Sequence, residues 1–494
     1  MISDNKIVAE SSSKNCYNME AIGEEIDEVN FDICDKVEKS MGEMLEKLPP
    51  LHKESSIYRV PKQQREMNPK VYLPQFISIG PYHYNTQNNL IANEQYKFRA
   101  FIKFLYRMIN RDYEYSQESL KGILKAGTLK HIVKTSHCWT KQVWNSYASS
   151  INMKEEEFII MMLVDACFII DFLLDPSFYI GLIFDIYIDL IKLENQLPLF
   201  LLQRLAYLLP ITPNPCFPGL VIARISGISD IYTFSSMHDP CDIEPKHFVD
   251  YLNFYFPQPL YDMTYNKQQE ENCGKKKSHV SFIHPYFCDF WNKMIHCAKN
   301  EKKKKREKRQ MPPSITELWE AGVTIKKAEN PKSITSITFK SGVLEIPHLN
   351  IHDSFEILMR NLIAFEQFSD PSKKKTCVIE YILFLDHLIS TEKDVRLLVK
   401  VGVINNSIGG SDKEVSDLFN DLCKYVTISK SSPYTEIINN LCEHCDEWWN
   451  RAMASLIHNY FNTPWAIISF FAGALLLILT LLQTIFSAIS AFPT

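Results

Sequence analysis

The chain has 494 residues, of which 46% are hydrophobic and 22% are charged, and this composition excludes both a wholly disordered chain and a transporter with many membrane spans. The formal net charge of -5 gives no reason to expect nucleic acid as a partner, because proteins that bind nucleic acids carry a clustered basic surface. The length allows one large domain with insertions, or roughly two or three ordinary domains.

The cysteines and the amino terminus indicate the compartment. The 13 cysteines are odd in number and irregularly spaced, unlike the disulfide framework of a small secreted domain, so we expect reduced thiols. Residues 1–13 are largely polar and lack the apolar core of a secretory signal. We therefore expect the bulk of the chain to be made in the cytosol.

The predicted elements begin after residues 1–30, a polar stretch that we expect to be flexible. Phe31 to Leu48 has the periodicity of a helix, and a pair of prolines ends it. The segment Ile57 to His83, rich in proline and aromatic residues, predicts an ordered extended loop. Helical periodicity resumes from Asn93 to Met108.

Two strongly apolar stretches follow, Phe158 to Leu174 and Phe178 to Leu202. Both contain charged residues, and each charge at the middle of a bilayer costs about 2.5–3.5 kcal/mol. We therefore interpret the two stretches as buried core helices rather than membrane spans. Their charged residues are Asp165, Asp171, Asp185, Asp189, Lys192 and Glu194.

Asp185 and Asp189 are candidates for a metal-binding or catalytic pair. They are four residues apart, so a helix places both carboxylates on one face, where they can bind a metal or act as acid and base. The competing interpretation is a solvated stripe on an otherwise buried helix, and we favour it because no third ligand is near in the sequence. Among the histidines, His83 stands out beside Pro81 and Tyr82, and we expect it to have a hydrogen-bonded structural role rather than to act as a general base.

Two regions are expected to be surface insertions, near residues 211–245 and 262–312. The first opens with the proline-rich stretch Pro210 to Pro218, and the second contains a compact basic run. Such a run can contact anionic lipid at about 1 kcal/mol per charge, direct a protein to the nucleus, or form a solvated loop. The candidate lipid-contacting residues are Lys302, Lys303, Lys304, Lys305 and Arg306.

The only clear hairpin signal lies at Ile334 to Ile346, where apolar residues alternate on both sides of a turn at Ser341 and Gly342. Helical patterns follow at Phe355 to Phe368, Cys377 to Ser390 and Thr435 to Tyr460. The fold class that we predict is therefore mainly α with a small β-hairpin, as one large helical domain over residues 31–460.

A short cluster, Cys442, His444 and Cys445, contains a CxxC pair, which can supply half of a tetrahedral zinc site. No second pair follows at the spacing of a zinc finger, so we favour thiols packed in a helix. The sequence Asn405, Asn406, Ser407 is a glycosylation sequon, and a glycan there would place the domain in a lumen or outside the cell. One sequon is weak evidence, because the pattern is common by chance.

The carboxyl-terminal segment Trp465 to Phe492 has no charged residue and predicts a helix of roughly 40 Å, enough to cross a hydrocarbon core of about 30 Å. Pro464 suits the first helical turn. Aromatic residues precede it as in an interfacial belt, namely Trp448, Trp449, Tyr460 and Phe461. The sequence thus predicts a tail anchor in a bilayer, a single-pass topology with the amino-terminal domain cytosolic, and residence in the plasma membrane or the endoplasmic reticulum.

The segment Ile57 to His83, with the sequence IYRVPKQQREMNPKVYLPQFISIGPYH, closely resembles the signature of the plant domain-of-unknown-function 247 family. Further blocks resemble the family in its order: LENQLPLFLLQRL from Leu193, SITELWEAGV from Ser314, SGVLEIPHLNI from Ser341, RNLIAFEQF from Arg360 and YFNTPWAIISFFAG from Tyr460. The resemblance implies a plant protein with a largely helical domain and a carboxyl-terminal membrane anchor, in a family without an established enzymatic activity. Some grass members are linked to self-incompatibility loci, which implies recognition between proteins.

No phosphate-binding loop, nucleophile elbow, kinase signature or dinucleotide-binding fingerprint occurs in the sequence, so we assign no catalytic residue and no cofactor. The function that we expect is protein recognition or signalling by a membrane-anchored protein, through the insertions near 211–245 and 262–312 and with an unidentified protein partner. The alternative is a membrane-associated enzyme of unrecognised class. A deep pocket in which ionisable groups converge around Asp185, Asp189 or His83 would favour that alternative.

Overall fold

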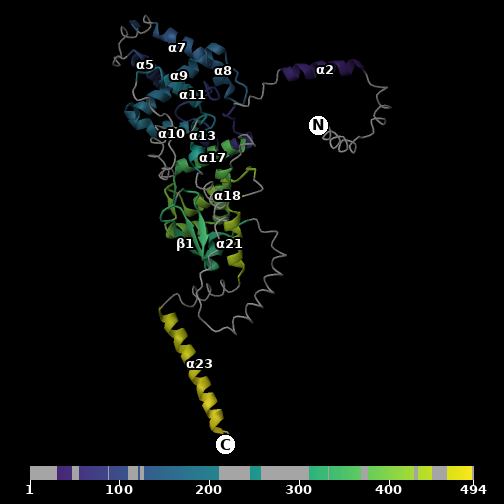
Figure 1. Ribbon diagram of the computed structural model, residues 1–494, viewed down its shortest axis with the longest axis vertical. Coiled ribbons are helices and arrows are strands. Elements are labelled where there is room, and N and C mark those ends of the chain that lie inside the picture. The colour runs from purple at the N-terminus through teal and green to yellow at the C-terminus, as the bar shows by residue number, and fades with distance from the viewer. Residues whose placement is uncertain are drawn as a thin grey trace, which may run out of the picture. The chain divides into compact units, whose positions relative to one another are not determined.

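The computed structural model describes residues 31–46, 55–86, 88–109, 121–122, 127–210, 245–256, 311–331, 333–368, 376–427, 432–447 and 464–491. The chain divides into two compact units, Met1–Lys53 and Glu54–Thr494 (Figure 1). In the first unit the described element is helix α2, Phe31–Glu46, which confirms the helix predicted there. The second unit is mainly helical with two small sheets, so the predicted mainly helical class is correct.

The first half of the second unit is built around helix α9, Glu155–Leu174, whose residues from Phe158 to Leu173 are almost all buried. A helix covered on every side needs apolar residues all round, which explains why this stretch resembles a membrane span in composition. Helix α5, Glu94–Met108, packs along α9. The other elements of this half are α3 (Lys62–Met67), η2 (Pro69–Val71), α4 (Asn88–Ile91), α7 (Thr128–His137), α8 (Thr140–Asn145), η3 (Pro176–Leu182), α10 (Ile183–Leu190), α11 (Leu199–Ala206) and α13 (Phe248–Tyr255).

Two predictions for this half need correction. The segment Ile57 to His83 is not extended throughout, because α3 and η2 occupy its middle, each starting at or just after a proline. The stretch Phe178 to Leu202 is not one helix, because α10 ends at Leu190 and α11 begins only at Leu199. Between them the side-chain Nε2 of Gln196 donates to the carbonyl oxygens of Leu190 and Lys192, at 2.6 and 2.9 Å, and satisfies carbonyl groups that a continuous helix bonds internally.

The second half of this unit contains the sheets. Strand β3, Val343–Ile346, lies between β1, Thr324–Lys327, to which it is parallel, and β2, Thr338–Lys340, to which it is antiparallel. The β2–β3 connection confirms the predicted hairpin, since Ser341 and Gly342 both have positive φ, as the favoured two-residue hairpin turn requires. The hairpin pattern did not indicate β1 or the parallel pair formed by β4 (Leu349–Ile351) and β5 (Ile404–Asn406).

Helices pack against these strands, and β1 and α21 share one end of this half in Figure 1. Three of the helices begin with a capping box, in which a Ser or Thr and an acidic residue three positions later exchange bonds with the backbone: α16 at Ser314, α19 at Thr391 and α20 at Ser411. The helices of this half are α16 (Ile315–Glu320), α17 (Asp353–Phe368), α18 (Cys377–Leu388), α19 (Glu392–Lys400), α20 (Asp412–Leu422) and α21 (Thr435–Asp446). The patterns at Phe355 and Cys377 are thus confirmed as helices.

Residues Pro464–Ala491 form helix α23, and Pro464 is its first residue, as predicted. The prediction that Trp465 to Phe492 crosses a membrane is wrong, because no helix in the described part of the chain has both the length and the apolar composition that a bilayer span requires. The predicted single-pass, tail-anchored localisation depended on that span and is therefore also wrong.

Glu366 connects α17 to α18. Its carboxyl oxygens accept hydrogen bonds from the backbone N–H groups of Val378 and Ile379, at 3.0 and 2.9 Å, in the first turn of α18. Burial raises the pKa of Glu366 to about 8, and the N–H donors, which favour the anion, reduce this rise without cancelling it. The Glu366 carboxyl is therefore protonated in the folded protein at neutral pH.

This protonation predicts an unusual pH dependence. The folded pKa of Glu366 lies above the ordinary value of 4.5, so the folded state binds more protons than the unfolded state between pH 4.5 and 8. Glu366 thus contributes stability that is complete below pH 4.5 and is lost as the pH rises towards 8. Relative to wild type, Glu366→Gln is expected to gain on the order of 4 kcal/mol of unfolding free energy over this range, measured by urea unfolding. Glu320→Gln, at an exposed residue, is the control. The prediction is contradicted if the stability of Glu366→Gln relative to wild type falls between pH 4.5 and 8.

Candidate functional site

The most concentrated group of buried polar residues runs from the last turn of α10 into the connection that leads to α11. Its members are Asp189, Lys192, Glu194, Asn195 and Gln196, each no more than 1% exposed. We call these five residues the polar hub. All of them except Gln196 bind backbone or side-chain groups of residues 57–83, which we call the proline-rich segment. The polar hub therefore fixes the backbone conformation of the proline-rich segment.

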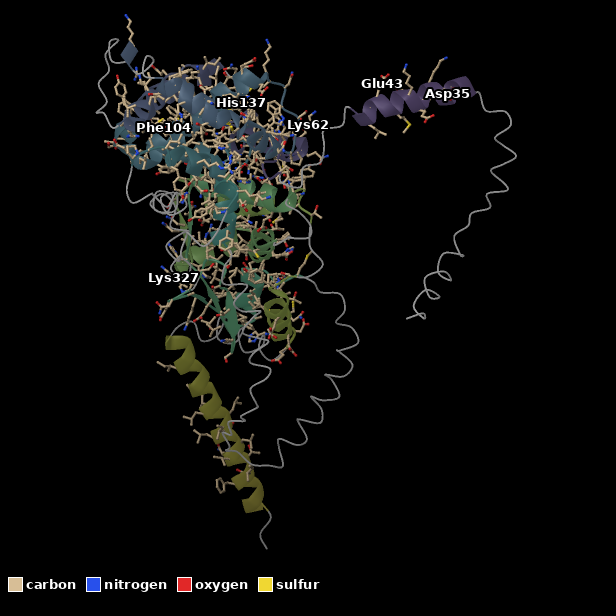
Figure 2. The ribbon with its side chains drawn as sticks, turned by 45° about the horizontal axis from the view of Figure 1, so that its top comes forward. Asp35, Glu43, Lys62, Phe104, His137 and Lys327 are labelled. Carbon is tan, nitrogen blue, oxygen red and sulfur yellow. The ribbon has the colours of Figure 1, made fainter. Side chains whose placement is uncertain are left out.

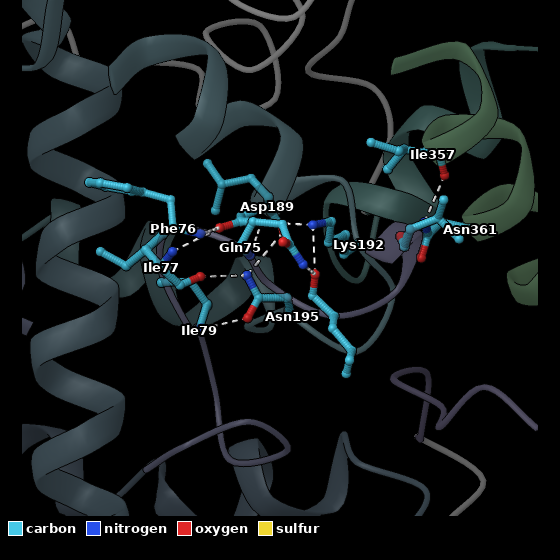
Figure 3. A network of polar contacts seen from close by, with 12 residues as sticks. Gln75, Phe76, Ile77, Ile79, Asp189, Lys192, Asn195, Ile357 and Asn361 are labelled. Carbon is cyan, nitrogen blue, oxygen red and sulfur yellow. Dashed lines mark hydrogen bonds and ion pairs between the residues drawn. The ribbon is translucent and has the colours of Figure 1, made fainter. Parts of the chain in front are cut away.

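Asp189 binds the middle of the proline-rich segment (Figure 3). The carboxylate accepts hydrogen bonds from three consecutive backbone N–H groups, those of Gln75 at 2.9 Å and of Phe76 and Ile77 at 2.7 Å each. Lys192 Nζ lies 2.9 Å from Asp189 Oδ1 and also donates to the carbonyl oxygen of Leu73 at 2.7 Å. The charge of Asp189 is thus balanced by one lysine and three N–H dipoles, as a buried carboxylate requires.

Asn195 continues the same row of contacts. Its Oδ1 accepts from the N–H of Ile79 at 2.6 Å, and its Nδ2 donates to the carbonyl oxygens of Ile77 and Asp189 at 3.1 and 3.0 Å. An asparagine amide carries both a donor and an acceptor, so it can replace a neighbouring strand for an extended backbone. Because of these contacts, residues 75–79 remain ordered without lying in a sheet.

Gly80 ends this row, and no other residue fits its place. Its φ is +73°, and a Cβ there lies only 2.7 Å from the carbonyl oxygen of Gln196 and 2.9 Å from the hydroxyl oxygen of Tyr147. The Gly80 N–H donates to Asp165 Oδ2 on α9 at 2.8 Å. The glycine of the sequence block FISIGPYH is therefore needed for close approach and for the turn.

Glu194 binds the two ends of the proline-rich segment. Its Oε1 accepts from the N–H of Val60 at 2.7 Å and pairs with Arg65, and its Oε2 lies 3.1 Å from His83 Nε2. Arg59 Nη1 is 3.9 Å from the same oxygen. Burial acts to raise the pKa of Glu194, but His83, Arg65 and the Val60 N–H outweigh burial and hold the pKa below its usual value.

Two further buried carboxylates on α9 bind α5. Asp165 Oδ1 lies 2.8 Å from Lys97 Nζ, which is also 2.7 Å from Glu94 Oε1. Asp171 pairs with Arg107 and Lys103 of α5 and accepts from the hydroxyl of Tyr179 at 2.8 Å. These ion pairs explain how α9 carries two aspartates inside an apolar core.

Asn361 links α17 to the same network, as Figure 3 shows. Its Oδ1 accepts from the N–H of Leu193 at 2.9 Å, and its Nδ2 donates to the carbonyl oxygens of Val71 and Ile357 at 2.9 and 2.7 Å. The two sequence blocks that begin at Leu193 and Arg360 therefore meet in space. Both blocks bind the proline-rich segment.

The structure does not bring the predicted pair Asp185 and Asp189 together as one site. Asp185 is exposed, whereas Asp189 is fully buried and its two oxygens are occupied by the contacts above. The interpretation that we favoured, a solvated stripe, is thus wrong for Asp189. Its burial is compensated by hydrogen-bond donors that lie far away in the sequence. His83 lies against Glu194, consistent with the structural role expected for it. Both carboxylate oxygens of Asp189 are thus engaged by Gln75, Phe76, Ile77 and Lys192.

The residues of the CxxC cluster lie on α21. Cys442 and Cys445 are buried, the Sγ of Cys442 is 3.6 Å from the carbonyl oxygen of Met311, and the His444 ring lies edge-on to Phe339 at 5.8 Å. Within the described ranges, no group of three or more His, Cys, Asp or Glu side chains is arranged to hold a metal ion. Asn405 is exposed on β5 and donates to Asn350 Oδ1 at 3.0 Å.

Several predictions fall outside the described residues. These are the flexible stretch 1–30, nearly all of the insertions near 211–245 and 262–312, the basic residues Lys302, Lys303, Lys304, Lys305 and Arg306, and the aromatic residues Trp448, Trp449, Tyr460 and Phe461.

The chain is similar to known plant proteins over most of its length. The family described as a plant protein of unknown function, DUF247, matches residues 57–479. The UPF0481 protein At3g47200 of Arabidopsis thaliana is 27% identical over 452 residues, which covers 88% of this chain and 86% of that protein. The putative UPF0481 protein At3g02645 of the same plant is 24% identical, over 92% of this chain and 94% of that protein. No solved structure matches. The family match covers most of the chain, including the whole polar hub and the proline-rich segment that it holds, and the chain therefore belongs to the DUF247 family of plant proteins of unknown function.

Proposed function

We propose that this protein recognises another protein through a surface formed by η3 and α10. Three large apolar side chains are exposed there: Phe178 is 49% exposed, Ile180 75% and Phe184 51%. We call these three residues the η3–α10 surface. Large aromatic and aliphatic side chains gathered on a surface are typical of protein-binding sites, whereas single exposed ones are common everywhere.

The backbone that carries this surface is firmly held. Tyr179, between Phe178 and Ile180 in sequence, points inward, is 1% exposed and donates its hydroxyl to Asp171. Its ring meets the rings of Phe168 and Phe172 edge-on at 5.6 Å each. A surface that is already ordered before binding loses less conformational entropy when a partner binds.

Charges near the surface favour a protein partner with an apolar pocket. The Lys103 ammonium lies 3.8 Å from the centre of the Phe178 ring, and this contact holds the ring in place. Lys103 is itself buried against Asp171 and is not free to bind a ligand phosphate or carboxylate. Asp185 is exposed next to Phe184 in sequence, so a basic residue at the edge of the partner's pocket suits it. Recognition between proteins is also the function that the family resemblance implies.

The proposal predicts that Ile180→Asp removes partner binding without unfolding the protein. An exposed position changes stability by about 0.5 kcal/mol or less, whereas a charge placed in the centre of an apolar interface reduces affinity by roughly tenfold or more. Quantitative proximity labelling in plant cells with the full chain measures partner recovery, and thermal unfolding checks the fold.

Tyr207→Asp is the matched control, because Tyr207 is 67% exposed at the end of α11 and is not part of the η3–α10 surface. Wild type and Tyr207→Asp are expected to recover one specific partner equally, and Ile180→Asp to lose it. Equal recovery of every labelled protein by all three chains would rule out the η3–α10 surface as the recognition site.

A further inference from the structure

Helix α2, in the first unit, has an apolar stripe of largely exposed side chains. Ile33, Val37, Met41, Met44 and Leu45 are between 50% and 66% exposed. Their spacing of three and four residues places them on one face of the helix. An isolated helix of 16 residues is marginal in water, so this stripe stabilises the helix only when something covers it.

The polar residues of α2 indicate the chemistry of the partner. The helix contains five acidic residues and two lysines, and it has no basic residue in its last turn. Figure 2 labels two of the acidic residues, Asp35 and Glu43, on this helix. The carboxyl end of a helix dipole favours cations, but Glu43 and Glu46 lie there instead. Basic residues of a partner would supply the missing cations.

The acidic character decides between three occupants. Helices that lie on anionic membranes have a mainly basic polar face, whereas acidic residues outnumber lysines on α2. A second copy of α2 would add like charges, and 16 residues give only about two heptads, fewer than the three or four of a coiled coil. A protein groove with an apolar floor and basic edges satisfies both the stripe and the charges.

We infer that α2 is a docking helix, whose apolar stripe binds an apolar groove edged by lysine or arginine residues on a partner protein. The inference goes beyond the η3–α10 surface, because it concerns a separate unit and different side chains. Each of the two surfaces can therefore be tested while the other is intact.

The experiment places the photo-crosslinking residue p-benzoylphenylalanine at Met41, in the stripe, in the full chain expressed in plant cells. The matched control places it at Lys39, which is exposed and lies on the opposite face of α2. Irradiation is expected to crosslink Met41 to apolar residues of one other protein, with lysine or arginine residues beside the crosslinked positions. The crosslinking yield at Lys39 should be lower than the yield at Met41 by about tenfold or more. A crosslink within the same chain, a crosslinked homodimer, a crosslink to lipid, or equal yields at both positions would overturn the inference.

Charge reversal tests the second half of the inference. The variant Glu38→Lys with Glu43→Lys is expected to lower the Met41 crosslink about tenfold, and high salt to weaken the wild-type crosslink by screening. Glu38→Gln with Glu43→Gln should lie between them. Ile180→Asp should leave the Met41 crosslink unchanged. If charge reversal has no effect, or if Ile180→Asp abolishes the crosslink, α2 has no basic partner of its own and the inference fails.

Discussion

Asp189→Ala is expected to lower the free energy of unfolding by about 4 kcal/mol, or to prevent folding. Removing the carboxylate leaves the Lys192 ammonium buried without its counter-charge and leaves the N–H groups of Gln75, Phe76 and Ile77 without acceptors. Breaking a buried ion pair from one side costs roughly 3–5 kcal/mol, and each orphaned N–H adds to this. Urea unfolding followed by circular dichroism measures the change.

Asp185→Ala, one turn earlier on α10, is the matched control, because Asp185 is exposed and should change stability by about 0.5 kcal/mol or less. The double variant Asp189→Asn with Lys192→Met removes both charges and should be less destabilised than the sum of the two single variants. If Asp189→Ala is as stable as Asp185→Ala, the polar hub does not hold the proline-rich segment.

Lys97→Met is expected to destabilise the protein by roughly 3–5 kcal/mol at pH 8 and by clearly less at pH 5. Lys97 is the buried counter-charge of Asp165, at 2.8 Å. Burial raises the pKa of Asp165 to about 6 even with Lys97 present, and loss of Lys97 raises it further. At pH 5 Asp165 of the variant can be protonated at little cost. At pH 8 the variant must either bury an unpaired carboxylate or protonate Asp165 at a pH where the free carboxylate is favoured, and both cost stability.

The direction of this pH dependence follows from the pKa of Asp165 in the folded and unfolded states. The folded pKa of Asp165 is above its ordinary value of 3.8, so its contribution to stability is complete below pH 3.8 and declines as the pH rises through about 6. Without Lys97 that decline extends to higher pH. Lys62→Met, at a side chain 86% exposed, is the control for loss of a positive charge. A Lys97→Met penalty that is independent of pH contradicts the role assigned to the pair.

The fold was predictable where periodicity and local chemistry agree. The helices at Glu94, Asp353 and Cys377, and the β2–β3 hairpin with Ser341 and Gly342 at its turn, all depend on residues close in sequence. Parallel strands were missed because β4 and β5 pair residues more than fifty positions apart, and three-residue strands carry almost no alternation. The break between α10 and α11 was missed because composition alone does not distinguish a buried turn from a buried helix.

The membrane span was overpredicted from composition and length. The charged residues of α9, in contrast, correctly indicated a core helix. α9 is as apolar as many spans, yet Lys97 and Arg107 of α5 pair with its aspartates inside a protein core. For the candidate site, the sequence singled out His83 and Asp189, and it indicated a structural role for His83 but not the buried position of Asp189. A carboxylate that accepts three backbone N–H groups has no signature at fixed spacing, since its partners lie more than a hundred positions away.

The polar hub also imposes an order on biosynthesis. The N–H of Ile77 is separated from Asp189 by 112 positions, the N–H of Val60 from Glu194 by 134, and the carbonyl of Val71 from Asn361 by 290. At about 5–20 residues per second, a ribosome needs roughly 5 to 25 s to synthesise the chain between Ile77 and Asp189. Throughout that interval the nascent proline-rich segment lacks the acceptors of the polar hub, so it cannot reach its folded conformation before Asp189 has been synthesised.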